Sequence, residues 1–150
     1  MTLSEKHGLK VVLDTNVWVS AILWGGLPAS IVRAAEDSKV LLIVSEEILQ
    51  EVSKTLAYPR LREIYEEIAA TREELMEAVL RVGKLVKVGT RLTIIREDPA
   101  DNKFLECAMD GNADYVVSGD AHLLELEHYQ RVRVLSVIRF CELLESADSA

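Results

Sequence analysis

The stretch Lys10-Val11-Val12-Leu13-Asp14-Thr15-Asn16 decides the fold class of this chain. Its apolar centre is nearly continuous, as expected of a parallel strand that is buried on both faces of a sheet. Other short β-rich runs alternate with helical patterns, which is typical of βαβ units. The predicted strands are residues 11–14, 40–44, 85–88, 113–118 and 132–135. We therefore expect an α/β protein with a three-layer α/β/α arrangement and a mostly parallel, five-stranded sheet.

Helical segments separate these strands, and several of them begin with capping signals. Ser45 is followed by two glutamates and is expected to cap a helix. Thr71 and Glu74 match a capping box. The predicted helices are residues 17–24, 28–38, 46–57, 60–69, 71–83, 101–110, 121–126 and 137–144. Residues 92–95 are expected to be extended or loop, and residues 146–150 are expected to fray.

The composition is that of one compact domain. The chain has 150 residues, of which 49% are hydrophobic, and its core is expected over about residues 10–144. No apolar run approaches the roughly 20 residues of a membrane span. Residues 1–8 lack the apolar stretch of a secretion signal, and both Cys107 and Cys141 fall in apolar helical patterns. We expect a cytoplasmic protein with two buried free thiols and no membrane association.

The net charge of −8 restricts the ways in which the chain could bind nucleic acid. A chain this acidic does not bind phosphates tightly by charge neutralisation alone. A nucleic-acid enzyme with this balance would need metal ions, a local basic patch or a basic partner.

Four acidic residues fall at strand ends or on an adjoining helix, namely Asp14, Glu51, Asp101 and Asp120. The carboxyl ends of parallel strands form the crevice in which ligands bind. Taken alone, each Asp is explained as a helix cap and Glu51 as a solvated helix residue. Carboxylates that gather in one crevice, however, repel one another and lose hydration unless a cation compensates. The combination therefore predicts a site for Mg²⁺ or Mn²⁺, which prefer oxygen ligands.

Such a site suits phosphodiester hydrolysis, because divalent ions can polarise the phosphate and lower the pKa of a bound water. Thr15 and Asn16 follow Asp14 directly and are expected to support the site. Lys103 is a candidate for binding a substrate phosphate, with pairing to a site carboxylate as an equal alternative. Arg60 and Arg62 are further candidates for RNA contact, with a solvated face as the alternative.

Four short segments resemble, in order and spacing, the successive motifs of PIN-domain ribonucleases. They are residues 13–17, 45–51, 98–108 and 113–124, and the match spans about residues 10–144. The branch that is most similar is the prokaryotic group of toxin components related to the VapC toxins. The resemblance implies that the four acids are the catalytic metal ligands and that Asn16, Asn102 and Ser118 are supporting polar residues.

One position departs from that pattern, because Ala100 stands where this branch often has another acid. Asp98 is retained and is a candidate for a further metal ligand. The resemblance also implies Mg²⁺- or Mn²⁺-dependent endoribonuclease activity, a homodimer, and a cognate antitoxin encoded next to the gene. The alternative is a PIN-like module that binds RNA or a protein with little or no turnover.

Overall fold

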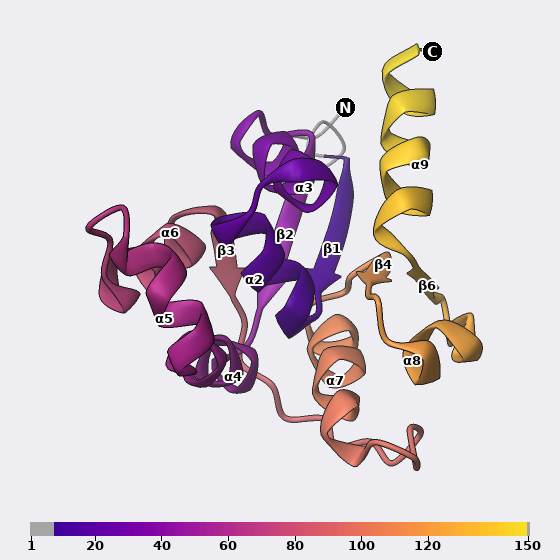
Figure 1. The fold of residues 1–150 in the computed structure, drawn as a ribbon. Helices are drawn as coiled ribbons and strands as arrows, with labels where there is room; N and C mark the ends of the chain where they lie inside the picture. The colour runs from indigo at the N-terminus through magenta and orange to yellow at the C-terminus, as the bar shows by residue number, and fades with distance from the viewer. Residues whose placement is uncertain (1–7, 150) are drawn as a thin grey trace.

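The computed structural model describes residues 8–149, and within them six strands form one sheet in the order β3-β2-β1-β4-β6-β5 (Figure 1). The strands are β1 (Leu9–Leu13), β2 (Val40–Val44), β3 (Gly83–Leu85), β4 (Tyr115–Val117), β5 (His128–Tyr129) and β6 (Val132–Leu135). Neighbouring strands are parallel except for β5 and β6, which are antiparallel. The predicted α/β class and mostly parallel sheet are confirmed, with six strands in place of five.

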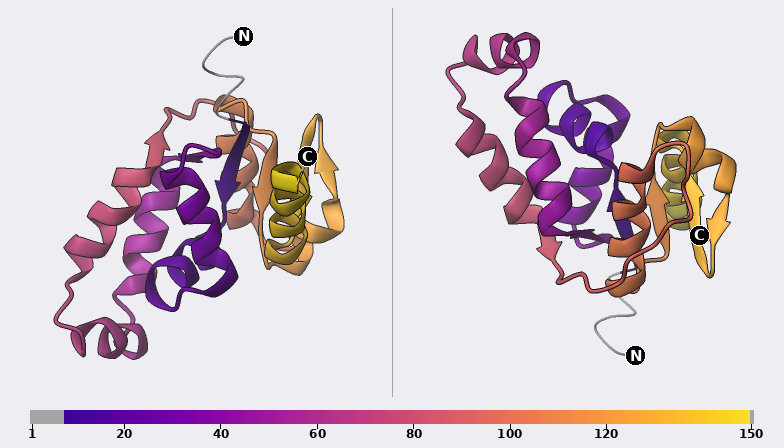
Figure 2. Two further views of the ribbon diagram at one scale, coloured as in Figure 1. Left: turned by 90° about the horizontal axis from the view of Figure 1, so that it is seen from above. Right: turned by 90° about the horizontal axis from the view of Figure 1, so that it is seen from below.

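Helices cover both faces of this sheet, as the three-layer prediction requires. The helices are α2 (Thr15–Leu23), α3 (Gly26–Glu36), α4 (Glu46–Leu56), α5 (Pro59–Glu66), α6 (Arg72–Val82), α7 (Asn102–Asp110), α8 (Ala121–Leu126) and α9 (Val137–Ser149). A short 3-10 turn, η1 (Pro99–Asp101), leads into α7. In the two views of Figure 2, α7 lies on the opposite side of the sheet from α2, α3 and α9.

The central strand β1 positions the first of the predicted acids. Val11, Val12 and Leu13 are all 0% exposed, because β2 and β4 flank β1 and helices pack on both faces. β1, β2 and β4 are parallel, so their carboxyl ends meet at one edge of the sheet, at the bottom of β1 in Figure 1. Asp14 and Ser118 directly follow β1 and β4 at this edge. A ligand site at this edge is therefore possible on geometric grounds.

The outer strands differ from the prediction. β3 occupies Gly83–Leu85 and not residues 85–88, and residues 86–98 contain no helix or strand. Gly83 begins β3 directly after α6, where an added Cβ would lie only 3.0 Å from the Val79 carbonyl oxygen. A small residue therefore lets the helix turn into the strand at once. β5 was not predicted, because two residues carry no recognisable alternation.

The helix ends were predicted more closely, with one exception. Thr71 and Glu74 form the predicted capping box at α6, and the Ser45 hydroxyl caps α4 by accepting a hydrogen bond from the Ile48 N–H. The predicted fraying of residues 146–149 is wrong, because α9 continues to Ser149, and residue 150 lies outside the described range.

The structure bears on the predictions about the two cysteines and about a membrane span. Cys107 and Cys141 are both free and buried, which confirms that prediction. Burial raises the pKa of the Cys107 thiol to about 12. Within residues 8–149 no single helix has the length and apolar content to cross a bilayer, and α2 with α3 qualifies only as a pair bent by 90°. Residues 1–7, which bear on the secretion prediction, lie outside the described range.

Candidate metal centre

Asp14 lies directly after β1 and is only 4% exposed. Its Oδ1 accepts a hydrogen bond from the Val17 N–H (2.8 Å), so Asp14 caps α2. Its Oδ2 accepts hydrogen bonds from the Ser118 hydroxyl (2.5 Å) and the Gly119 N–H (3.2 Å). Burial raises the pKa of Asp14, and these hydrogen bonds oppose that rise. Asp14 is therefore both a helix cap and a buried carboxyl at the ligand-binding edge.

Asp120 lies three residues after the end of β4. Its Oδ1 accepts hydrogen bonds from the N–H groups of His122 (2.8 Å) and Leu123 (3.2 Å), so it caps α8. The Asp120 N–H donates to the Ser118 hydroxyl oxygen (2.9 Å), and that hydroxyl in turn donates to Asp14. Ser118 thus links the two acids that follow neighbouring parallel strands.

Asp98, Asp101 and Asp120 form the tightest group of acids among the described residues. All three are half-buried, and one carboxylate oxygen from each lies within 4.8 Å of the other two. Neither Asp98 nor Asp101 caps a helix through its side chain within the described part of the chain, so capping does not explain them. Asp101 Oδ2 is buried and has no hydrogen-bond partner among residues 8–149. Burial, and then repulsion from Asp120 and Asp98, raises the pKa of Asp101 to about 7.

Glu51 lies in the same cleft but is engaged by other side chains. It borders the buried stripe of α4, next to Val52, as its spacing predicts. The Thr15 hydroxyl donates a hydrogen bond to Glu51 Oε1. Lys103 Nζ lies 2.5 Å from Glu51 Oε2. Of the two contacts expected for Lys103, the structure therefore contains the pairing with a site carboxylate.

An open cleft of about 400 Å³ brings the predicted acids together. The site residues that line it are Asp14, Thr15, Asn16, Glu51, Asp98, Asp101 and Asp120. Asn16 is exposed there. Arg60 and Arg62 are not among the lining residues: Arg60 is exposed at the start of α5, and Arg62 Nη2 lies 3.6 Å from Glu66.

Asn102 fixes the segment that precedes Asp98. Its Oδ1 accepts hydrogen bonds from the N–H groups of Ile94 (3.0 Å) and Ile95 (2.9 Å). Its Nδ2 donates to the carbonyl oxygens of Ile95 and Pro99, each at 3.0 Å. Asn102 is 4% exposed, so these four contacts saturate a buried amide. This residue, predicted to support the site, contacts the backbone on either side of Asp98.

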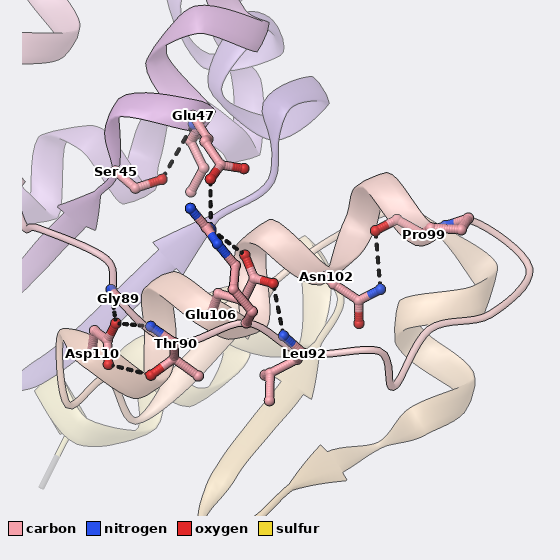
Figure 3. A network of polar contacts seen from close by, with 11 residues as sticks. Ser45, Glu47, Gly89, Thr90, Leu92, Pro99, Asn102, Glu106 and Asp110 are labelled. Carbon is pink, nitrogen blue, oxygen red and sulfur yellow. Dashed lines mark hydrogen bonds and ion pairs between the residues drawn. The ribbon is translucent and has the colours of Figure 1, made fainter.

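Glu106 and Asp110 lie on the same face of α7 as Asn102, and they also accept hydrogen bonds from the backbone of the segment before Asp98 (Figure 3). Glu106 Oε2 accepts a hydrogen bond from the Leu92 N–H (2.9 Å), and Asp110 Oδ2 accepts one from the Thr90 N–H (2.9 Å). Arg91 Nη1 contacts Glu106 Oε1 at 3.2 Å. Neither acid was predicted to have a role. Glu106 lies four residues after Asn102, and Asp110 lies four residues after Glu106. This spacing, in a helix that is otherwise largely buried and apolar, is the signal that could have found them.

The acidic group fits a hard divalent cation. Every donor is a carboxylate oxygen, which is the ligand type that Mg²⁺ and Mn²⁺ prefer. Asp101 supplies an oxygen with no protein partner, and its raised pKa reflects burial and negative charge that nearby cations do not offset. Asp98, Asp101 and Asp120 are the residues that would hold such an ion, with Asp14 next to them.

This arrangement defines an α/β protein whose acidic site lies at the carboxyl ends of parallel strands. A family model described as PIN domain matches residues 10–122, a span that includes all five acids of the cleft. The chain therefore belongs to the PIN domain family. It is also similar to the uncharacterized protein MJ1680 of Methanocaldococcus jannaschii, with 30% identity over 123 residues that cover 81% of this chain and 77% of that protein.

A solved structure has a similar fold. It is the crystal structure of VapBC2 from Rickettsia felis bound to a DNA fragment from their promoter. The likeness has a TM-score of 0.60 and 12% sequence identity, and it covers 85% of this chain and 98% of the matched chain. At this level of identity the comparison shows a shared fold.

Proposed function

We propose that this chain is a divalent-metal-dependent endoribonuclease that hydrolyses RNA phosphodiester bonds. The observation that carries the proposal is the group of Asp98, Asp101 and Asp120, with its partnerless buried oxygen on Asp101. Membership of the PIN domain family supports it. When bound, Mg²⁺ or Mn²⁺ would polarise the scissile phosphate and lower the pKa of a bound water.

The protein residues have separate roles in this proposal. Asp98, Asp101 and Asp120 hold the ion, and Asp14 adds negative charge while Ser118 fixes its position relative to Asp120. Glu51 is the fifth acid of the cleft, and Thr15 orients its carboxylate. The exposed amide of Asn16 is placed to donate a hydrogen bond to RNA in the cleft.

The experiment that tests this function compares cleavage of labelled RNA by the full chain with Mg²⁺, with Mn²⁺ and with chelator. We expect cleavage with either metal and none with chelator. Asp101→Asn should reduce kcat/KM by about 100-fold or more, since losing an ion's charge stabilisation costs several kcal/mol. Asp37→Asn, which changes an exposed aspartate after α3, is the matched control and should cleave like wild type.

Two results would contradict the proposal. Cleavage that survives in both Asp14→Asn and Asp101→Asn would indicate a contaminating nuclease. RNA binding without cleavage under all metals would favour the alternative, a PIN-like binding module without turnover.

We also propose that the chain acts in the cytoplasm as the toxin of a toxin–antitoxin pair and forms a homodimer. The similarity of its fold to a chain of the VapBC2 structure supports the proposed role in a toxin–antitoxin pair. An antitoxin segment would then cover the cleft, with an Arg among the acids. Titrating a co-encoded small protein should abolish cleavage, and unchanged cleavage at saturation would refute the pairing. Sedimentation should give twice the chain mass of 16.8 kDa, and a monomer would refute the dimer.

A further inference from the structure

A second hollow, separate from the acidic cleft, lies beside the hairpin of β5 and β6. Its volume is about 630 Å³. Polar residues that line it are Glu127, His128, Gln130, Arg133, Ser136 and Arg139. Two arginines therefore face a single acid there, in a chain whose net charge is −8. The hollow therefore has more positively than negatively charged side chains, whereas the whole chain has a negative net charge.

The arginines are available to bind an anion. Arg133 is an exposed position on β6, opposite His128 in the antiparallel register. Among residues 8–149, Arg133 makes no side-chain hydrogen bond or ion pair. Arg139 Nε lies 3.6 Å from Glu142, but both side chains are more than 60% exposed, at 72% and 64%. An exposed pair of this kind is weak and opens easily.

The hollow lies at the other end of α8 from the acidic cleft. Helix α8 begins at its cap Asp120, in the cleft, and ends before Glu127, in the hollow. The Val134 N–H donates to the Glu127 carbonyl oxygen (2.9 Å), which fixes the end of α8 against β6. In Figure 1, α8 lies below β6 and to the right of α7. At 1.5 Å per residue, the six residues of α8 separate the two sites by on the order of 10 Å.

We infer that this hollow binds a backbone phosphate of RNA, a few nucleotides from the phosphodiester that lies at the acidic cleft. The inference rests on the proposed function and extends it to a second contact with the same substrate. Single-strand binding by acidic proteins requires cations concentrated where the backbone runs. Arg133 and Arg139 supply them, and the Gln130 amide adds a neutral donor. The hollow is thus the local basic patch that the overall charge demands.

The test uses the full chain and a labelled single-stranded phosphorothioate RNA dodecamer, with Ca²⁺ in place of Mg²⁺ to suppress cleavage. The variant Arg133→Gln/Arg139→Gln keeps polar stems of similar length. The control Arg72→Gln/Arg81→Gln removes the same charge from α6. Fluorescence anisotropy is measured at several salt concentrations, and circular dichroism verifies that all proteins are folded.

We expect the hollow variant to bind about tenfold more weakly, with the salt slope of log K reduced by about 0.7, the value for one phosphate contact on a single strand. The control should bind like wild type. A dinucleotide is too short to reach the hollow, so its metal-dependent cleavage should be equal in the variant and wild type. Weaker cleavage of the dodecamer should appear as a raised KM.

The outcomes separate this inference from the proposed function. Wild-type protein that neither binds nor cleaves RNA would refute the proposed function, and this inference with it. Wild-type cleavage with unchanged affinity in the hollow variant would overturn the second contact alone. Equal losses in the hollow variant and the control would also overturn it, because they would reflect total charge. Retained RNA affinity with lost binding of polyglutamate would assign the hollow to an acidic protein instead.

Discussion

The ammonium group of Lys103 lies 2.5 Å from Glu51 Oε2, so a positively charged group of the protein already contacts one of the five acids in the cleft. The pair is half-buried, with side chains 13% and 33% exposed, and Lys103 also lies 5.6 Å from the centre of the Phe104 ring. A metal ion that recruited Glu51 would have to compete with this ammonium group. The pairing therefore sets how negative the cleft is before any ion binds.

Replacing Lys103 by Met should tighten Mn²⁺ binding, because the variant removes the positive charge that contacts Glu51 and keeps an apolar stem against Phe104. We expect an increase of about three- to tenfold in affinity, given the distance and the partly solvated surroundings. Free Mn²⁺ measured by electron paramagnetic resonance during titration gives the affinity. Lys54→Met, at an exposed lysine in the same cleft, should change it less than about twofold. Weaker binding in Lys103→Met would mean that Lys103 instead holds Glu51 in place as a ligand.

The pKa of Asp101 predicts how the metal-free protein responds to pH. Its folded-state pKa of about 7 lies above the ordinary value, so the folded chain holds this proton more tightly than the unfolded chain. The stability that this group contributes is therefore complete below about pH 4 and is lost as the pH rises through about 7. The Tm in chelator should fall between about pH 4 and 7, and less steeply in Asp101→Asn. Asp14, whose pKa is also raised, should leave a residual slope of the same sign.

Metal binding should have the opposite pH dependence, since the ion requires the ionised carboxylate. Mn²⁺ affinity should rise with pH up to about 7 in wild type, following the ionisation of Asp101. Asp37→Asn should reproduce both wild-type profiles, because Asp37 is exposed and remote from the cleft. If Tm changes with pH equally in wild type and in Asp101→Asn, the Asp101 carboxyl ionises normally and the prediction is wrong.

Asn102→Ala should destabilise the fold, because it leaves the N–H groups of Ile94 and Ile95 without their acceptor. We expect a loss of about 3 kcal/mol in the free energy of unfolding, from one to two unsatisfied buried donors. Urea unfolding measures this loss, and hydrogen exchange should show that residues 94–95 lose protection. Gln50→Ala, at an exposed amide, should change stability by less than about 0.5 kcal/mol. Full protection at residues 94–95 in Asn102→Ala would show that Asn102 does not hold this segment in place.

Gly111→Ala should also be destabilising, for a reason of packing. A Cβ at this position would lie 2.7 Å from Ile43 Cγ2 and 3.0 Å from the Cys107 carbonyl oxygen, where the end of α7 meets β2. We expect a cost of about 1–3 kcal/mol in urea unfolding, as for other overpacked sites. Gly89→Ala is the control, because nothing lies within 4 Å of an added Cβ there. Equal stability of the two variants would show that α7 shifts at no cost.

The parts of the fold predicted from sequence are those that local patterns specify. β1 and β2 carry enough apolar residues to be recognised, and Asp14, Ser45 and Asp120 each cap the helix that follows a strand. Capping depends on residues three positions apart, so it can be read from adjacent sequence. β3 and β5 have only three and two residues, and their pairing partners define them more than their own composition does.

The sequence by itself determined which acids would meet at one edge, because parallel strands place their carboxyl ends together. Asp14 directly follows one of these strands, and Asp120 lies three residues after another. Only the tertiary structure decided which of these acids form one group and which acid pairs with a lysine. Asp98 lies near Asp101 and Asp120 because Asn102 and Glu106 of α7 accept hydrogen bonds from the irregular segment that precedes Asp98. Glu51 turns instead to a lysine 52 residues away in the chain. Contacts between such distant residues depend on how whole elements pack, and no local pattern encodes that.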